Sequence, residues 1–472
     1  MDKLIAKLTG NTSFKFKDWL LDNIVTLIFW VFIIVGLLVA NDVTMDWFFT
    51  ELCNRFYRNA FLILSLIIPV VAGLGLNFGI VVGAIAGQLA VIAVRYWDLS
   101  ILINRGVDLS DAAAVAANPT LFSGGTGLLF MLLVALPIAI LIGWLTGSLY
   151  NKTKGQEMIT SLIVGFFGNG VYQFIVLFAI GAIIPVMLEH PMILYDGVGV
   201  RMSVDMGSVS YSLDNIWQVP FAPFMAVVCG LVLLFLLWNQ FVRKSKVEGR
   251  SVKLNPLKFG LFSLLSLGIG IFFLVQTLNK GEMTKVRDVP VMLVIVIVIL
   301  AVFITWLMST KLGQDFRSCG MNQTIAEANG INVNRTRVIA TIMSTVLAAW
   351  GMIFYLQNMG TLNTYTAHNN IGYFSVAAIL VGGASVRKAT IGQAITGCLL
   401  FHAMFILSPE IGKAVFGQAA LGEYFRTFMV YGVIGLSLGL YVWRANKRNQ
   451  LVLPKAENMK EDIKELTKGG LR

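Results

Sequence analysis

Apolar segments of about 20 residues recur along almost the whole chain, and they constrain its fold more than any other feature. A bilayer's hydrocarbon core is about 30 Å thick, and a helix of about 20 apolar residues crosses it. Because lipid offers no hydrogen-bond partners, each crossing segment must satisfy its own backbone groups, which favours helices. The expected spans are about 24–40, 59–76, 78–94, 126–149, 158–188, 219–242, 259–278, 289–309, 337–357, 372–386, 389–407 and 426–443. The sequence therefore predicts an all-α polytopic membrane protein with about 12 transmembrane segments.

Composition and net charge agree with this fold class. The 472 residues are 57% hydrophobic and 13% charged, whereas ordinary soluble domains carry about 25% charged residues. We expect a basic amphipathic segment at 1–22 that lies on membrane lipid, a transmembrane domain at 23–443 and a cytoplasmic tail at 444–472. Basic cytoplasmic segments explain the net charge of +11, so no nucleic-acid partner is expected.

The charges of the connecting segments predict the orientation. Segment 243–258 is rich in Lys and Arg, whereas segment 188–216 is mainly acidic. Because basic loops are retained inside, the first is expected in the cytoplasm and the second outside, with both termini cytoplasmic in a plasma or inner membrane. The two long outer segments, 95–125 and 188–216, could dock a soluble partner or form a lid. Solvated connections are an equal alternative.

The middles of the expected spans hold almost no ionisable side chains. Proton-driven transporters, charged-ring ion channels and membrane-embedded hydrolases all need such groups. His402 has no carboxylate near it in the sequence and is expected to be a packed histidine. The four cysteines lack the spacing of metal ligands. The sequence therefore predicts no catalytic residue, no metal site and no cofactor held by this chain.

Neutral polar side chains and glycines do occur within the spans. The amides of this kind are Asn77, Gln88, Asn169, Gln173 and Gln393. They either form hydrogen bonds between helices or line a path for an uncharged or zwitterionic solute. Gly79, Gly83 and Gly87 are spaced four apart on one helical face, which permits close approach of a second helix.

A polar segment at 316–338 interrupts the apolar pattern. We expect Gly313 to end the preceding helix, and a short cytoplasmic helix to occupy about 314–330. Thr324 and Glu327 have the spacing of a capping box, and Asn322 is a rival cap. Gly330 followed by Ile331 is typical of a left-handed helix stop with an apolar anchor.

The segment "GGASVRKAT", residues 382–390, superficially resembles a phosphate-binding loop. That loop requires a glycine directly before the lysine, and here Arg387 precedes Lys388. We therefore expect a basic cytoplasmic turn, and no ATP site of this kind on the chain.

The segment "GMNQTIAEANGIN", residues 320–332, resembles the G-x-N-x-x-x-A-x-x-x-G-I-N pattern of permease subunits in ribose-type ATP-binding-cassette (ABC) importers. "TKLGQDFRSCG" before it, and "YFSVAAILVGGAS" and "IGQAITGCLLF" after it, are similar to the same family. The likeness covers about 288–443 well and 59–190 more loosely. Asn77-Phe78-Gly79 instead resembles the branched-chain amino-acid permeases, and the region about 230–290 adds a pair of spans to the usual ten or so.

The resemblance implies an ABC importer permease fold whose short cytoplasmic helix is the coupling helix. Its partners would be ABC ATPase subunits that hold ATP and Mg, a second permease subunit (an identical copy or a paralogue) and an extracytoplasmic solute-binding protein. The expected substrate is a monosaccharide or nucleoside; a branched-chain amino-acid permease and a stand-alone secondary transporter are the alternatives. The residues expected to contact the ATPase are Phe316, Arg317, Asn322, Ile325, Glu327 and Gly330.

Overall fold

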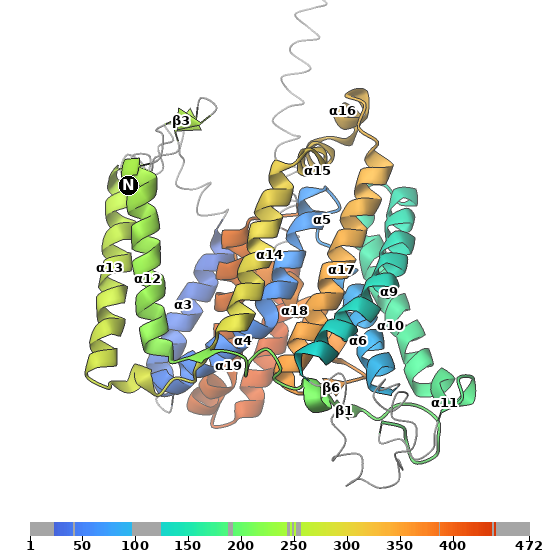
Figure 1. Ribbon diagram of the computed structural model, residues 1–472, viewed down its shortest axis with the longest axis horizontal. Helices are drawn as coiled ribbons and strands as arrows, with labels where there is room; N and C mark the ends of the chain where they lie inside the picture. Colours follow the sequence, from blue (N-terminus) through green and yellow to red (C-terminus); the bar gives the residue numbers. More distant parts are fainter. Residues whose placement is uncertain are drawn as a thin grey trace, which may run out of the picture.

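Helix α17 (Val333–Met359) packs most extensively against α9 (Gly125–Lys152) and α6 (Ile80–Tyr96), and these three helices lie in the right half of the bundle in Figure 1. Asn332 caps the start of α17 by accepting a hydrogen bond from the backbone N–H of Arg335, at 3.0 Å. Gly360, in the left-handed conformation, ends the helix. The computed structural model describes residues 23–40, 43–96, 124–186, 192–242, 246–247, 250–251, 256–386, 388–436 and 439.

The remaining elements follow the chain in this order: α3 (Ile24–Val39), α4 (Met45–Ser65), α5 (Ile67–Val71), α10 (Glu157–Phe174), a π-helical turn (Ile175–Ala179), α11 (Ile180–Ala182), β1 (Ser203–Asp205), a 3-10 turn (Gly207–Val209), β2 (Gln218–Val219), α12 (Phe221–Leu237), a second π-helical turn (Trp238–Val242), β3 (Lys246–Val247), β4 (Arg250–Ser251), α13 (Pro256–Leu278), a second 3-10 turn (Glu282–Thr284), β5 (Val289–Pro290), α14 (Val291–Ser309), α15 (Lys311–Met321), α16 (Gln323–Ala328), β6 (Thr361–Asn363), α18 (Ala367–Val381) and α19 (Ile391–Phe416). Residues 419–436 form a further helix.

The helices confirm a multi-pass membrane architecture. Among the described residues, 6 helices are long and apolar enough to cross a bilayer, and three shorter apolar helices accompany them: α3, α6 and α12. The expected span 59–76 differs most, because α4 begins at Met45 and carries Glu51, Arg55 and Arg58 before its apolar half. The figure of about twelve crossings remains a prediction.

Two ends of the bundle can be distinguished. Figure 1 places α15 and α16 at one end, called here the α16 end, and β1 and β6 at the opposite end, called the β1 end. Strand β3, from the basic segment 243–258, lies at the α16 end. The basic segment 243–258 and the short helical segment expected in the cytoplasm therefore lie at the same end. The expectations for 1–22, 444–472 and most of 95–125 fall outside the described residues.

Helices α12 and α13 form a hairpin whose two members pack chiefly against each other (Figure 1). The hairpin begins before, and overlaps, the region about 230–290 that was expected to add a pair of spans to the family pattern. Many of its large apolar side chains are exposed, among them Leu231, Phe235 and Leu264. Such surfaces are compatible with contact to lipid, where apolar side chains need no protein partner.

The described part of segment 188–216 is folded against the β1 end of the bundle. Strand β1 pairs antiparallel with β6, with Val204 opposite Leu362, and Val200 and Met206 are fully buried. The hydroxyl of Thr364 donates to the carbonyl of Arg201 at 2.8 Å. Residues 192–216 therefore fold against the bundle while side chains such as Tyr195 stay exposed, and docking a partner, forming a lid or serving as a solvated connection are all still predictions.

The glycine spacing on α6 has the predicted consequence for packing. A Cβ added at Gly83 would lie 2.6 Å from the Cβ of Ala348, and one at Gly87 would lie 2.5 Å from the carbonyl oxygen of Ala349, both on α17. Cβ atoms added at Gly143 and Gly147 of α9 would lie 2.8 and 3.0 Å from Cα atoms of α17, and Gly143 has Thr345 as a neighbour in common with Gly83. Glycines on both α6 and α9 therefore let these two helices pack closely against α17. Gly79 differs, because it faces the hydroxyl of Tyr150 rather than α17.

Replacement of Gly87 by alanine should lower the stability of the protein by about 1–3 kcal/mol, because the new methyl group would push α17 away through its backbone. Thermal unfolding in detergent, followed by tryptophan fluorescence, measures this change. Gly230→Ala in α12 is the matched control, since nothing lies within 4 Å of its added Cβ. Equal unfolding temperatures for Gly87→Ala and Gly230→Ala would contradict the packing argument.

Candidate functional site

The polar segment between α14 and α17 forms two short helices rather than one. Thr310 starts α15, where its hydroxyl accepts from the backbone N–H of Gly313 at 3.4 Å. Asn322 then breaks the run and caps α16, accepting from the N–H of Ile325 at 3.2 Å. The predicted helix at about 314–330 is therefore split at Asn322, and Gly313 lies inside α15 instead of ending the preceding helix.

The C-terminal stop of this unit is confirmed, whereas the capping box is wrong. Gly330 has φ 79°, and the N–H of Ile331 returns to the carbonyl of Ala326 at 3.0 Å. Glu327 does not complete a box with Thr324, because its carboxylate pairs with Lys154 at 3.6 Å. Asn322, the rival, is the residue whose side chain caps α16.

The side chains of α15 and α16 divide into an anchored face and an exposed face. Phe316 is fully buried and Cys319 is 2% exposed, so both anchor α15 to the bundle. The expectation that Phe316 contacts a partner is therefore wrong for its side chain. Met321 and Ile325 are 82% and 60% exposed. Arg317, Asn322, Glu327 and Gly330 are exposed as well.

The junction of α15 and α16 is a ridge between two hollows. One cavity of about 510 Å³ lies toward the turns at Gly73 and Gly155, and another of about 640 Å³ lies toward Thr305 and Thr390. Gly320 and Met321 line both of them. A ridge with exposed apolar side chains and hollows on both sides is suited to a concave protein surface.

Helix α15 rests directly on the turn between α5 and α6. A Cβ added at Gly320 would lie 2.2 Å from the carbonyl oxygen of Val71, and one at Gly73 would lie 2.6 Å from the Cα of Gly320. Backbone therefore touches backbone at this point, and only glycine fits. A displacement of α15 must move the α5–α6 turn with it.

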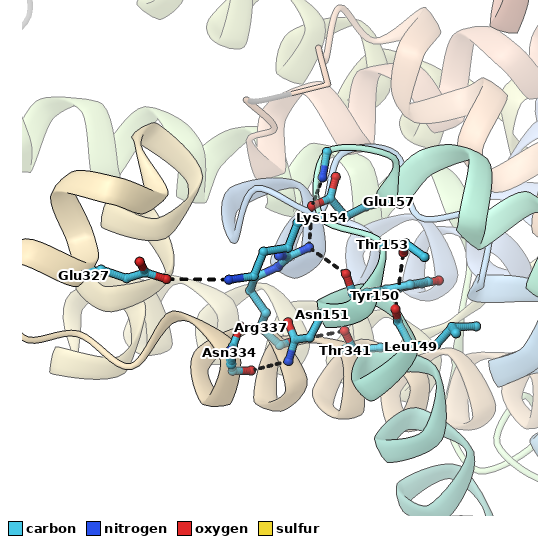
Figure 2. A network of polar contacts seen from close by, with 11 residues as sticks. Leu149, Tyr150, Asn151, Thr153, Lys154, Glu157, Glu327, Asn334, Arg337 and Thr341 are labelled. Carbon is cyan, nitrogen blue, oxygen red and sulfur yellow. Dashed lines mark hydrogen bonds and ion pairs between the residues drawn. The ribbon is translucent and has the colours of Figure 1, made fainter.

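A polar network joins α16 and the start of α17 to the turn between α9 and α10 (Figure 2). Lys154 reaches Glu327 across this seam, and the side-chain amide of Asn151 donates to the carbonyl of Asn334 at 2.9 Å. Arg337 is fully buried beneath them, and its Nη2 donates to Glu157 Oε1 at 2.5 Å and to the carbonyl of Tyr150 at 3.4 Å. Of these residues, the sequence analysis singled out only Glu327.

A second polar cluster lies where α10 meets α18. The side-chain oxygen of Asn169 contacts His368 Nε2 at 2.7 Å, and Gln173 Nε2 donates to the same oxygen at 3.4 Å. The rings of Tyr172 and His368 meet edge to face, with centroids 4.7 Å apart. The sequence analysis paired Asn169 with Gln173 correctly, but it missed His368, because α18 begins five residues earlier than the expected span 372–386.

Gln88 belongs to the same region of the bundle. Ile85 of α6 lies next to Gly168 of α10, so Gln88, nearly one turn further on, is level with Tyr172. Gln88 donates to the carbonyl of Asn363 at 3.3 Å. Within the described part of the chain, Gln88 Oε1, the Tyr172 hydroxyl and His368 Nδ1 are buried with no hydrogen-bond partner. Such unsatisfied groups are costly unless a ligand or water completes them.

Two amides predicted to line a path lie elsewhere. Asn77 is buried at the α5–α6 break, where its Oδ1 accepts from the hydroxyl of Tyr150 at 2.9 Å and from the N–H of Gly79 at 3.0 Å. Gln393 sits in the first turn of α19 and donates to the carbonyl of Gly383 at 2.7 Å. Both therefore have local structural partners and stand apart from the cluster around His368.

His402 is buried, as expected of a packed histidine, with the rings of Phe401 and Phe405 against it.

At the β1 end, Asp214 is buried and accepts from Asn358 at 2.6 Å and Gln357 at 3.4 Å. Burial raises the pKa of the Asp214 carboxyl above its ordinary value, and the two amide hydrogen bonds oppose this shift. These two hydrogen bonds attach segment 192–216 to the last turn of α17.

Curated relatives of this chain are permease proteins. It is 26% identical to the xylose transport system permease protein XylH of Haemophilus influenzae over 53% of this chain and 64% of the relative. It is 32% identical to the probable ABC transporter permease protein YphD of Escherichia coli over 27% of this chain and 40% of the relative. It is 28% identical to the nucleoside ABC transporter permease protein NupC of Lactococcus lactis over 40% of this chain and 53% of the relative. The chain thus spans less than two thirds of the length of these relatives.

No solved structure gives a significant match. The model of one protein family, described as branched-chain amino acid transport system / permease component, matches residues 70–434. This range includes the α15–α16 unit, the network around Arg337 and the cluster around His368. The resemblance to permeases of ribose-type ABC importers is confirmed, and the chain belongs to this permease family.

Proposed function

We propose that this chain is the permease subunit of an ABC importer that carries a monosaccharide or nucleoside and is driven by ATP hydrolysis on separate ATPase subunits. The observation that carries the proposal is the ridge at the α16 end. There the apolar side chains of Met321 and Ile325 project beside the charges of Arg317 and Glu327. Exposed apolar side chains within a charged surround are typical of a protein interface.

The proposal places the α16 end in the cytoplasm of a plasma or inner-membrane protein, with both termini on that side and about twelve crossings between. The complex would contain two ATPase subunits and a second permease subunit, either a copy of this chain or a paralogue. A solute-binding protein would deliver the solute to the β1 end. Two of the relatives are named for xylose and nucleoside transport, which supports an uncharged, hydroxyl-bearing solute.

The polar cluster around His368 supports the same class of solute. Its members are Gln88, Asn169, Tyr172, Gln173 and His368. They offer both donors and acceptors without a carboxylate or an ammonium group. The unpartnered atoms of Gln88, Tyr172 and His368 could be satisfied by the hydroxyl groups of a passing solute.

Ile325→Asp should weaken the association of the ATPase by about 30-fold, because it replaces an apolar contact worth about 2 kcal/mol with a charge. Co-purification of the ATPase with tagged permease in detergent measures this loss. Ile216→Asp is the matched control, since Ile216 is 57% exposed against 60% for Ile325 but lies beyond β1, away from α16. Equal loss of the ATPase in both variants would remove the ridge from the interface.

Asn169→Leu should slow uptake about tenfold or more while leaving association with the ATPase unchanged, because it removes the oxygen that holds His368 and Gln173 in place. ATP-dependent uptake of radiolabelled xylose or uridine into proteoliposomes is the measurement. Asn279→Leu, at an exposed position after α13, is the control for a lost amide. Normal uptake by Asn169→Leu would exclude the cluster from the path.

A further inference from the structure

We propose that Arg337 and Glu157 are positioning residues which make α9, α10 and α17 move together when α16 is displaced. This inference rests on the proposed function, because it assumes that an ATPase acts on α16. Arg337 is the fifth residue of α17, and Glu157 is the first residue of α10. The backbone carbonyl of Tyr150, the second partner of Arg337, lies in the last turn of α9. One guanidinium group therefore ties three helix ends together.

Stability alone does not account for this ion pair. Arg337 is fully buried, and the side chain of Glu157 is 11% exposed. The desolvation of two buried charges costs several kcal/mol each, and well-packed apolar side chains are often equally or more stabilising. Arg337 Nε and Nη1 also have no hydrogen-bond partner among the described residues. The pair instead fixes the relative position of the helices that carry it. A charge-assisted hydrogen bond of 2.5 Å has a preferred geometry, so it resists a shift of α17 along α10 more than an apolar contact would.

The pair lies beneath the contact between the α9–α10 turn and the α16–α17 segment, called here the seam. Two surface contacts of the seam join the same pair of segments. Lys154 of the α9–α10 turn pairs with Glu327 of α16, and Asn151 of α9 bonds to the backbone of Asn334 in α17 (Figure 2). The Lys154–Glu327 pair is half exposed, at 43% and 54%, and surface pairs of this kind contribute little stability. The Arg337–Glu157 pair is shielded from water, so solvent competes with it less than with the Lys154–Glu327 pair. The N–H of Gly155, at 3.0 Å, holds the same oxygen of Glu157 that Arg337 contacts.

The seam continues inward to the α5–α6 break. Tyr150 accepts from Arg337 through its carbonyl and donates through its hydroxyl to Asn77 Oδ1, at 2.9 Å. The N–H of Phe78 donates to the hydroxyl of Ser161 in α10, at 3.1 Å. Helix α15 rests on the same break through Gly73 and Gly320. The α15–α16 unit is thus connected to the α5–α6 turn in two ways: through Arg337 and Tyr150, and through the contact of Gly320 with Gly73. Asn77 links Tyr150 to this turn.

The test compares uptake per ATP hydrolysed in the reconstituted complex of permease and ATPase. Arg337→Met alone leaves Glu157 buried without its partner and is expected to fold poorly. The double variant Arg337→Met with Glu157→Leu removes both charges, keeps the volume and should fold. We expect its basal ATP hydrolysis and ATPase association to stay within about twofold of wild type. Its uptake of xylose or uridine per ATP should fall about fivefold or more.

Tyr150→Phe removes only the hydroxyl contact to Asn77, and it should lower uptake per ATP in the same direction by a smaller factor. The control is Arg55→Met with Glu51→Leu, an ion pair of 3.7 Å within α4 that is more exposed, at 29% and 33%, and does not join α9, α10 and α17. A purely structural role of Arg337 and Glu157 would reduce the amount of folded complex without changing uptake per ATP. An unchanged ratio in the double variant would therefore overturn the inference while leaving the proposed function standing. Absence of ATP-dependent uptake by the wild type would overturn both.

Discussion

The backbone contacts of α17 with α6 and α9 are the constraint on which the rest of the bundle depends. Gly83 and Gly87 of α6, and Gly143 and Gly147 of α9, let both helices approach α17 so closely that an added Cβ would lie 2.5 to 3.0 Å from its atoms. Close-packed elements of this kind transmit displacement, because they have no soft layer that could absorb it. Helix α17 begins next to α16, so a movement that starts at the α16 end reaches the centre of the bundle directly.

Much of this architecture could be predicted from local patterns. The apolar segments predicted most of the membrane helices, the glycine spacing predicted the close approach of α6, and Gly330 with Ile331 predicted the end of α16. Each of these signals lies within one or two helical turns of the chain. The period of the helix also carried information that the sequence analysis did not use. Gly313, Phe316 and Cys319 recur every three residues, and this face is the one that is buried in α15.

The features that were missed depend on distant parts of the chain. Arg337 looked like an ordinary basic residue at the edge of a span, because its partner Glu157 is 180 residues away in the sequence. Asn77, Gln88 and Gln393 were grouped because each is a neutral amide among apolar residues. Only the fold separates Gln88, near the His368 cluster, from the structural roles of Asn77 and Gln393. His368 was overlooked because the boundary of α18 was placed by hydropathy, which ignores a polar first turn.

Helix α10 alone connects the network around Arg337 with the polar cluster around His368. It runs without interruption from Glu157 to Phe174, so Asn169 lies twelve residues, or about 18 Å, along the same rod from Glu157. The contact between Asn169 and His368 of α18 measures 2.7 Å, and a relative shift of about 1 Å would take it out of hydrogen-bonding range. A small displacement imposed on Glu157 at the α16 end would therefore open the polar contact between α10 and α18. A stiff helix with an ion pair at one end and a single amide contact near the other can thus convert a displacement of α16 into a change in the cluster around His368, the group of side chains that we propose to contact the solute.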